Sequence, residues 1–157
     1  MRKAKSQKAN QSRRDRGQSV IEFGLFVPWL ILLFVGALDW GFFAYSLIAT
    51  EAAARIGALY TSTSSTTVTD SSTACTYALN QLRDMSNVGS SLTTCVSGTS
   101  VTSAEPVGIS ATSITGPDGN PAAQLSVTYL TPVFMPLPGL LPGQVTITRS
   151  FQMRVRS

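Results

Sequence analysis

The chain has 157 residues, enough for one modest domain beyond a membrane segment, and a formal net charge of +4. That charge is confined to residues 1–17, which carry seven Lys or Arg against Asp15 alone, whereas residues 18–157 carry five Arg against seven acids. The remaining chain therefore has no basic face for nucleic acid. Because histidine is absent, a Ser-His or Cys-His catalytic pair and a His-ligated zinc site are excluded. We predict that the protein is not an enzyme and uses neither a cofactor nor a metal.

The first element in chain order is a basic leader, residues 1–17, that ends in Gly17. A carboxylate, Glu22, follows five residues later at the start of a long apolar run. A basic segment, a glycine and a carboxylate in this order are typical of a prepilin, in which a peptidase removes the leader. The arrangement predicts cleavage between Gly17 and Gln18.

The second element is a membrane-spanning helix. Phe23 to Leu38 carries no charge, and aromatic residues from Trp40 to Tyr45 suit a membrane surface. Spanning a bilayer takes roughly 20 apolar residues, so residues 20–45 suffice, and Pro28 is expected to kink or locally open the helix. The basic leader predicts a cytoplasmic N-terminus and an extracytoplasmic C-terminus, with the chain in the inner membrane.

A cleaved secretory signal is the competing interpretation of this apolar run. Such a signal has an apolar core of about 7–15 residues followed by small residues. Here the core is longer, and the only Ala-x-Ala sequence, Ala52 to Ala54, lies between Glu51 and Arg55. These features favour the membrane helix.

Strong helix formers continue to Tyr60, so one helix is expected from Ser19 to Tyr60, about 60 Å long at 1.5 Å per residue, within a membrane-spanning and projecting segment of residues 18–60. Glu51 and Arg55 are spaced for an i, i+4 ion pair. Ala49, Ala53 and Gly57 form a ridge of small residues, which allows close helix packing. The alternative is that alanine is there simply as the best helix former.

Glu22 has two interpretations. Ser19 and Glu22 fit a capping box, and an acid in the first turn complements the helix dipole. An acid carried into an apolar interior is also costly unless it is paired. Cleavage after Gly17 creates an ammonium group on Gln18, and the ammonium of one subunit is expected to meet Glu22 of its neighbour during assembly.

Residues 61–157 are expected to form a small extracytoplasmic α+β head, with one helix on a three- or four-stranded antiparallel sheet. The Ser/Thr-rich residues 61–69 predict a linker or exposed loop. A helical period predicts a helix from Ser72 to Asn87, capped by Ser71 or Ser72. Further segments are a strand over residues 107–115, a turn over 116–121, alternation at Leu125, Val127 and Tyr129, an apolar Pro-rich loop over 132–143, and a last strand over 145–156.

The last strand has the clearest pattern in the head. Its apolar residues share one face, which Arg149 interrupts, so that face is not expected to be sealed at its middle: Val145, Ile147, Phe151, Met153 and Val155.

Cys75 and Cys95 both lie on the predicted outer side. Two thiols in an oxidising compartment usually pair, and a disulfide closing about twenty residues contributes about 3 kcal/mol. Two unpaired thiols are the alternative.

The sequence from Arg16 to Phe23, the apolar run with Pro28, Asp39-Trp40-Gly41, and Glu51-Ala-Ala-Ala-Arg55-x-Gly57 together resemble the TadE-like family. Members are pseudopilins or minor pilins of tight-adherence (Flp-type) pilus systems. The Pro-Leu-Pro-Gly-Leu-Leu segment and the final strand resemble the family more loosely. Phe23 stands where Flp-type pilins tend to have Tyr, which argues against the major pilin.

The resemblance implies a role in pilus assembly and cell adhesion, with processing by a prepilin peptidase at Gly17–Gln18. The partners that it implies are the peptidase, other pilins or pseudopilins, the inner-membrane assembly platform and the membrane. Gly17 and Glu22 are the two residues of this chain to which the resemblance assigns a role. Two alternatives remain open, which are a pilin-like subunit of a secretion system and a membrane-tethered extracytoplasmic binding domain that does not polymerise.

Overall fold

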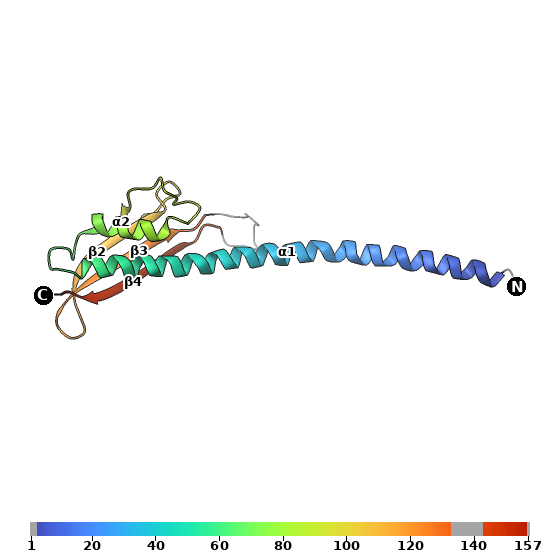
Figure 1. Ribbon diagram of the computed structural model, residues 1–157, viewed down its shortest axis with the longest axis horizontal. Coiled ribbons are helices and arrows are strands. Elements are labelled where there is room, and N and C mark those ends of the chain that lie inside the picture. Colours follow the sequence, from blue (N-terminus) through green and yellow to red (C-terminus); the bar gives the residue numbers. More distant parts are fainter. Residues whose placement is uncertain (1–2, 133–142, 157) are drawn as a thin grey trace. The chain divides into compact units, whose positions relative to one another are not determined.

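The computed structural model describes residues 3–132 and 143–156, with side chains described from Val20 onward. Contacts divide the chain into two compact units, residues 1–40 and residues 41–157. The first unit is helical. The second, here called the head unit, contains the end of the same helix, a second helix and a sheet (Figure 1). The predicted α+β class with a long N-terminal apolar helix is confirmed. The expected Pro-rich loop over residues 132–143 falls almost wholly outside the described residues.

Helix α1 covers Lys3–Thr61 and continues through Pro28. The expected helix start at Ser19 is wrong for the chain that carries its leader. The cause is local, because Lys, Ala, Gln and Arg dominate the sequence before Gly17 and all favour helix. At the other end, the Thr61 hydroxyl donates to the carbonyl of Ala58 at 3.1 Å, and the Ser62 amide donates to the same carbonyl at 3.0 Å. Hydroxyl side chains that compete for the last carbonyls end the helix there.

Helix α2 covers Ser71–Leu82. Its cap is Asp70, whose carboxylate accepts the Thr73 amide at 3.0 Å, and not Ser71 or Ser72 as expected. The helix also ends before the expected Asn87. Asn87 instead donates to the carbonyl of Leu130 at 2.8 Å and accepts the hydroxyl of Tyr129. Two contacts with the strand carrying Tyr129 replace the last turn of helix.

The sheet has the order β1-β2-β3-β4. Its strands are β1 (Val96–Ser97), β2 (Val107–Thr115), β3 (Pro121–Leu130) and β4 (Thr146–Arg154). The β2–β3 and β3–β4 pairs are antiparallel, as predicted, whereas the short β1, which the sequence did not predict, pairs in parallel with β2. The β2–β3 turn closes with a 2.8 Å bond from the Gly116 amide to the Asn120 carbonyl, and Gly119 supplies a positive φ of 75°.

Both helices of the head unit pack on one face of the sheet, which makes two layers. Small α1 residues meet α2 and the inward side chains of β2, β3 and β4 in one core: Ala53, Ala58, Ala78, Leu82, Val107, Leu125, Val127, Tyr129 and Ile147. The alternation predicted for β4 is present, and Arg149 is exposed on the inner side opposite Val127. The Ser/Thr-rich segment after α1 is a loop with several exposed residues, as one of the two predictions had it, and not a linker, because hydrogen bonds among its own hydroxyls hold it and Val68 is buried at 4% exposure.

Candidate functional site

The predicted cleavage site, Gly17–Gln18, lies within the helical backbone of α1. Glu22 lies one turn of helix beyond Gln18, and it is exposed in the described chain. Ser19 is inside the helix, so it does not cap a helix start here. A helix start beside Glu22 therefore requires removal of the leader.

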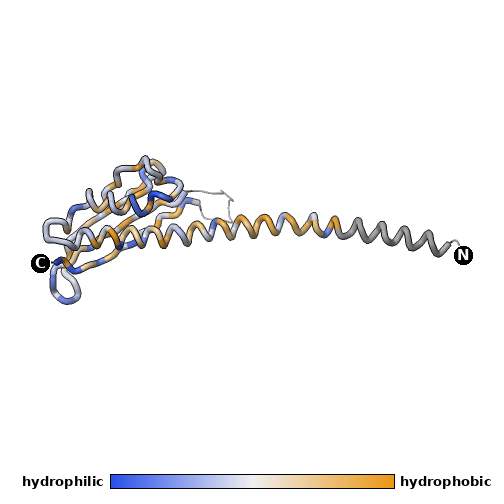
Figure 2. The backbone as a smooth tube through the Cα atoms, viewed as in Figure 1, coloured by the Kyte–Doolittle hydropathy of each residue, from blue (hydrophilic) through white to orange (hydrophobic). Residues whose placement is uncertain are grey.

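The residues after Glu22 expose apolar side chains in every direction around α1. Four successive leucine or isoleucine residues, 30–33, are each 42–63% exposed, although neighbours on a helix point 100° apart. Figure 2 shows this apolar stretch along α1. The helix is long and apolar enough to cross a membrane, and none of its most apolar part is buried. A helix that is hydrophobic all round requires an apolar environment outside the chain.

The ridge of small residues lies in the head unit. Ala49, Ala53 and Gly57 are all buried. A Cβ placed on Gly57 would overlap Cδ2 of Leu125 and would lie 3.7 Å from the carbonyl oxygen of Ala74. The ridge thus faces β3 and α2 of the same chain, where the absence of larger side chains permits close approach.

Arg55 does not pair with Glu51 as the spacing suggested. Its guanidinium carbon lies 5.2 Å from the centroid of the Phe151 ring on β4, a cation–π contact. Among the described residues Glu51 has no ion pair within 4 Å, and its side chain is exposed. The ring of Phe151, brought up by the sheet, offers Arg55 a partner that helix spacing alone does not reveal.

Cys75 and Cys95 form the predicted disulfide, with their Cα atoms 5.9 Å apart. Cys75 lies in α2, and Cys95 directly precedes β1. The bridge therefore ties the helix layer to the start of the sheet across twenty residues, of which those after Leu82 form neither helix nor strand.

Two further polar contacts were missed from the sequence, one between the two helices and one between β3 and the segment after α2. The Tyr60 hydroxyl donates to the Asp70 carboxylate at 2.8 Å, and the Tyr60 ring lies 5.2 Å from that of Tyr77. The hydrogen bond from the Thr73 amide is the largest of the effects that lower the pKa of Asp70.

The second contact joins Tyr129 of β3 to Asn87, forty-two residues earlier in the chain. Burial raises the pKa of the Tyr129 hydroxyl to about 12.

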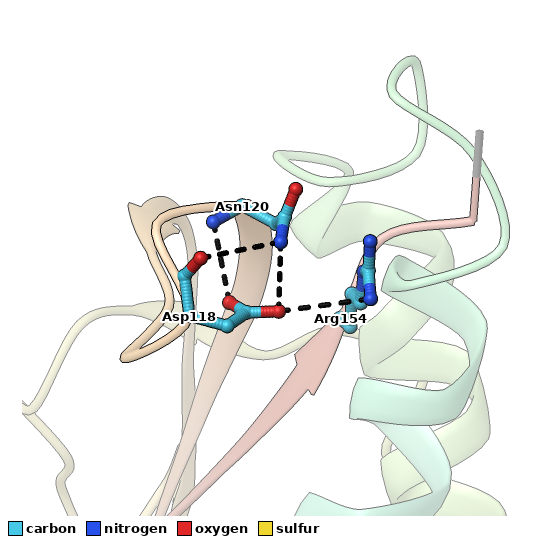
Figure 3. Close-up of polar contacts among 3 residues, drawn as sticks. All are labelled: Asp118, Asn120 and Arg154. Carbon is cyan, nitrogen blue, oxygen red and sulfur yellow. Dashed lines mark hydrogen bonds and ion pairs between the residues drawn. The ribbon is translucent and has the colours of Figure 1, made fainter.

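Figure 3 shows the polar cluster at the β2–β3 turn. Asp118 accepts from the Asn120 side chain at 2.9 Å and from the Asn120 amide at 3.2 Å, and the side-chain bond does most to lower its pKa. Arg154 of β4 lies 3.7 Å away, but both side chains are exposed, at 68% and 46%. An exposed ion pair of this length contributes little to stability.

No group of three or more potential metal ligands occurs in the part of the chain that the structure describes. Asp70 and Asp118 serve as a helix cap and a turn ligand. The described chain also exposes the apolar part of α1.

The family model described as TadE-like protein matches residues 17–59, roughly a quarter of the chain. This match confirms the resemblance found in the sequence, and it begins at Gly17 and includes Glu22 and the ridge of small residues. The family points to a pilin-like protein associated with Tad pili, a structural and not an enzymatic class. No curated protein and no solved structure matches the chain.

Proposed function

We propose that this chain is a pseudopilin or minor pilin that takes part in assembly of a tight-adherence, Flp-type pilus. A prepilin peptidase removes residues 1–17. Residues 18–60 anchor the protein in the inner membrane and project beyond it, and residues 61–157 form the extracytoplasmic head. Its partners are other pilins or pseudopilins and the assembly platform in the membrane.

The observation that carries this proposal is the exposed, all-round apolar surface of α1 directly after Gly17 and Glu22. Phe23 is 67% exposed and Leu25 is 74% exposed. Such a surface needs lipid before assembly and neighbouring apolar helices after it. A subunit that moves from membrane to filament meets both needs with the same residues.

The position of Glu22 fits the second environment better than the first. Glu22 lies at the membrane entrance of α1, where a carboxylate held against lipid is costly. Removal of the leader leaves an ammonium on Gln18, four residues away and therefore one helical turn. In an assembly of parallel helices, the ammonium of one subunit pairs with Glu22 of the next and sets their relative height.

The charge distribution supports an N-in orientation. All seven cations outside the head unit belong to residues 1–17. Positive residues beside a membrane helix stay in the cytoplasm, so the head is extracytoplasmic. The disulfide between Cys75 and Cys95 is consistent with that compartment, which is oxidising.

N-terminal sequencing and intact-mass measurement of the protein from its native host test the proposal. We expect a mature N-terminus at Gln18 in the wild type and retention of the leader in Gly17→Leu, because the added side chain fills the place of a residue that has none. Gly24→Leu is the matched control, since nothing lies within 4 Å of a Cβ at that position in α1, and it should be cut normally. An intact leader in the wild type would favour a tethered domain that does not polymerise, and an N-terminus near residue 54 would indicate ordinary secretion.

A further inference from the structure

The part of α1 inside the head unit has an exposed apolar stripe. The outer stripe consists of Tyr45, Ile48, Ala52, Ile56 and Leu59, which recur every three or four residues and so share one side of the helix. Ile48 is 68% exposed and Leu59 is 58% exposed. The opposite side of the same helix is the buried ridge that packs on the sheet. The head unit leaves the outer stripe uncovered.

Lipid does not reach most of this stripe. If the span begins at Val20, a hydrocarbon layer of about 30 Å takes roughly 20 residues and ends near residue 40. Ile56 and Leu59 then follow sixteen and nineteen residues beyond that end of the span in the sequence. An exposed apolar surface at that height is typical of a protein interface.

Charges of opposite sign lie at two different heights beside the outer stripe. Glu51 flanks it, and a shallow pocket lined by Ile48, Ala52, Arg55 and Ile56 adjoins the carboxylate. Near the end of α1, the exposed side chains of Arg154 and Arg156 line a cleft of about 630 Å³ together with Leu59. The remaining lining residues of this cleft are Ser62, Thr63, Gln152 and Met153.

These charges are available to a partner. Glu51 has no ion pair among the described residues, and the contact of Arg154 with Asp118 is long and exposed. We call the cleft lined by Arg154 and Arg156 the arginine cleft. Ser62, which also lines it, follows Glu51 by eleven residues, which corresponds to about 16 Å along the helix axis. Residues 41–157 as a whole carry five Arg and five acids, so two head units do not repel each other through net charge.

We propose that the outer stripe and the arginine cleft dock a second copy of this chain, displaced by about 16 Å along the helix axis. Glu51 of one copy then meets Arg154 and Arg156 of the next, while Tyr45 and Ile48 of the first copy cover Ile56 and Leu59 of the second. The contact joins different surfaces on the two copies, so it repeats without closing, as a filament requires. This inference rests on the proposed function and specifies the contact that sets the axial step in the head.

Charge reversal with site-specific cross-linking tests the contact. Full-length chains carrying either Ala52→Cys or Thr63→Cys, positions eleven residues apart, are co-expressed in the native host and treated with a short bismaleimide. A cross-linked pair is expected when both variants are present and not with either alone. Glu51→Arg places four cations together, because Arg55 lines the same pocket as residue 51, and it should lower the yield by at least roughly fivefold, since like charges at an interface are costly.

The combined variant Glu51→Arg, Arg154→Glu, Arg156→Glu restores the opposite signs and should recover the cross-link, which also shows that the head still folds. Glu105→Arg makes the same change of charge at an exposed acid outside both pockets, and it should cross-link like the wild type. The contact would be overturned if Glu51→Arg cross-linked with the wild-type yield. It would also be overturned if the combined variant did not recover the cross-link, or if the cross-links formed only to another protein.

Cleavage of the leader and the dependence of pili on Glu22 show whether a negative result contradicts this inference or the proposed function. If Gly17 is cut and pili depend on Glu22 while Glu51→Arg cross-links normally, the head contact is wrong and the pilin function stands. If the leader is never cut and no pilus depends on the chain, the proposed function itself fails.

Discussion

Gly57 of α1 lies against the fully buried side chain of Leu125 on β3, closer than any other residue would allow. The contact sets the distance between the helix and the sheet in the head unit. It also explains why a residue that weakens helices stands in the middle of one.

Gly57→Ala should lower the free energy of unfolding of the head by up to about 2 kcal/mol. The gain in helix propensity is about 1 kcal/mol, whereas overpacking a filled core costs about 1–3 kcal/mol, and the Leu125 side chain that must shift is fully buried. Denaturant unfolding of the purified chain measures the change. Gly41→Ala is the control, because a Cβ there meets nothing within 4 Å, and it should be neutral or stabilising. In a Leu125→Ala background the penalty at residue 57 should vanish, and a persistent penalty would refute the steric explanation.

Replacing both cysteines, Cys75→Ala with Cys95→Ala, should destabilise the head by about 3 kcal/mol, because the unfolded chain regains the freedom of a loop of about twenty residues. A head of this size buries a small core and depends on such a constraint. Thermal or denaturant unfolding checks the loss. Under non-reducing conditions the native wild type should be two hydrogens lighter than the reduced chain, and two freely alkylated thiols would contradict the bridge.

Stability should fall in alkali through Tyr129. Its pKa is raised to about 12 in the folded head by burial, against about 10 when unfolded, so the folded state keeps the proton that the unfolded state loses. The contribution is complete below pH 10 and is lost between pH 10 and 12, with a slope approaching about 1.4 kcal/mol per pH unit. Tyr129→Phe should lack this slope, while Tyr77→Phe, at an exposed ring, should retain it. Identical alkaline slopes in all three proteins would exclude Tyr129 as the cause.

Tyr129→Phe should also cost about 1–2 kcal/mol at neutral pH, because Asn87 loses the hydrogen bond that its side-chain oxygen accepts. Asn87→Ala should cost a similar amount, and the double variant should cost less than the sum of the two. Denaturant unfolding of the four proteins measures this coupling. Additive costs would mean that the two side chains do not act together.

Glu22→Gln should leave membrane insertion and leader cleavage intact while reducing assembly. The change keeps size and polarity but removes a charge-assisted hydrogen bond, worth about 1.5–3 kcal/mol per contact. Cross-linking of this protein to itself and to the major pilin, with pilus counts at equal protein levels, is the measurement. If Glu22→Gln cross-links and supports piliation like the wild type, Glu22 acts only as a helix cap.

Much of this protein follows from local sequence. The all-round apolar run after Gly17 determined the exposed part of α1, and a period of two determined β3 and the alternating faces of β4, including exposed Arg149. Two cysteines beyond the membrane segment were enough to predict their bridge. These predictions succeed because propensity, side-chain period and compartment act over a few residues or on the chain as a whole.

Tertiary structure decided the rest, because the deciding partners are distant in sequence. Asn87, which the helical period placed in α2, bonds Tyr129 more than forty residues away, and α2 ends at Leu82. Arg55 exchanges the neighbour that helix spacing offers, Glu51, for the ring of Phe151 on β4. Glu51 is therefore left exposed beside the outer stripe. An i, i+4 ion pair on a helix contributes only a few tenths of a kcal/mol, so a cation–π contact supplied by the sheet replaces it.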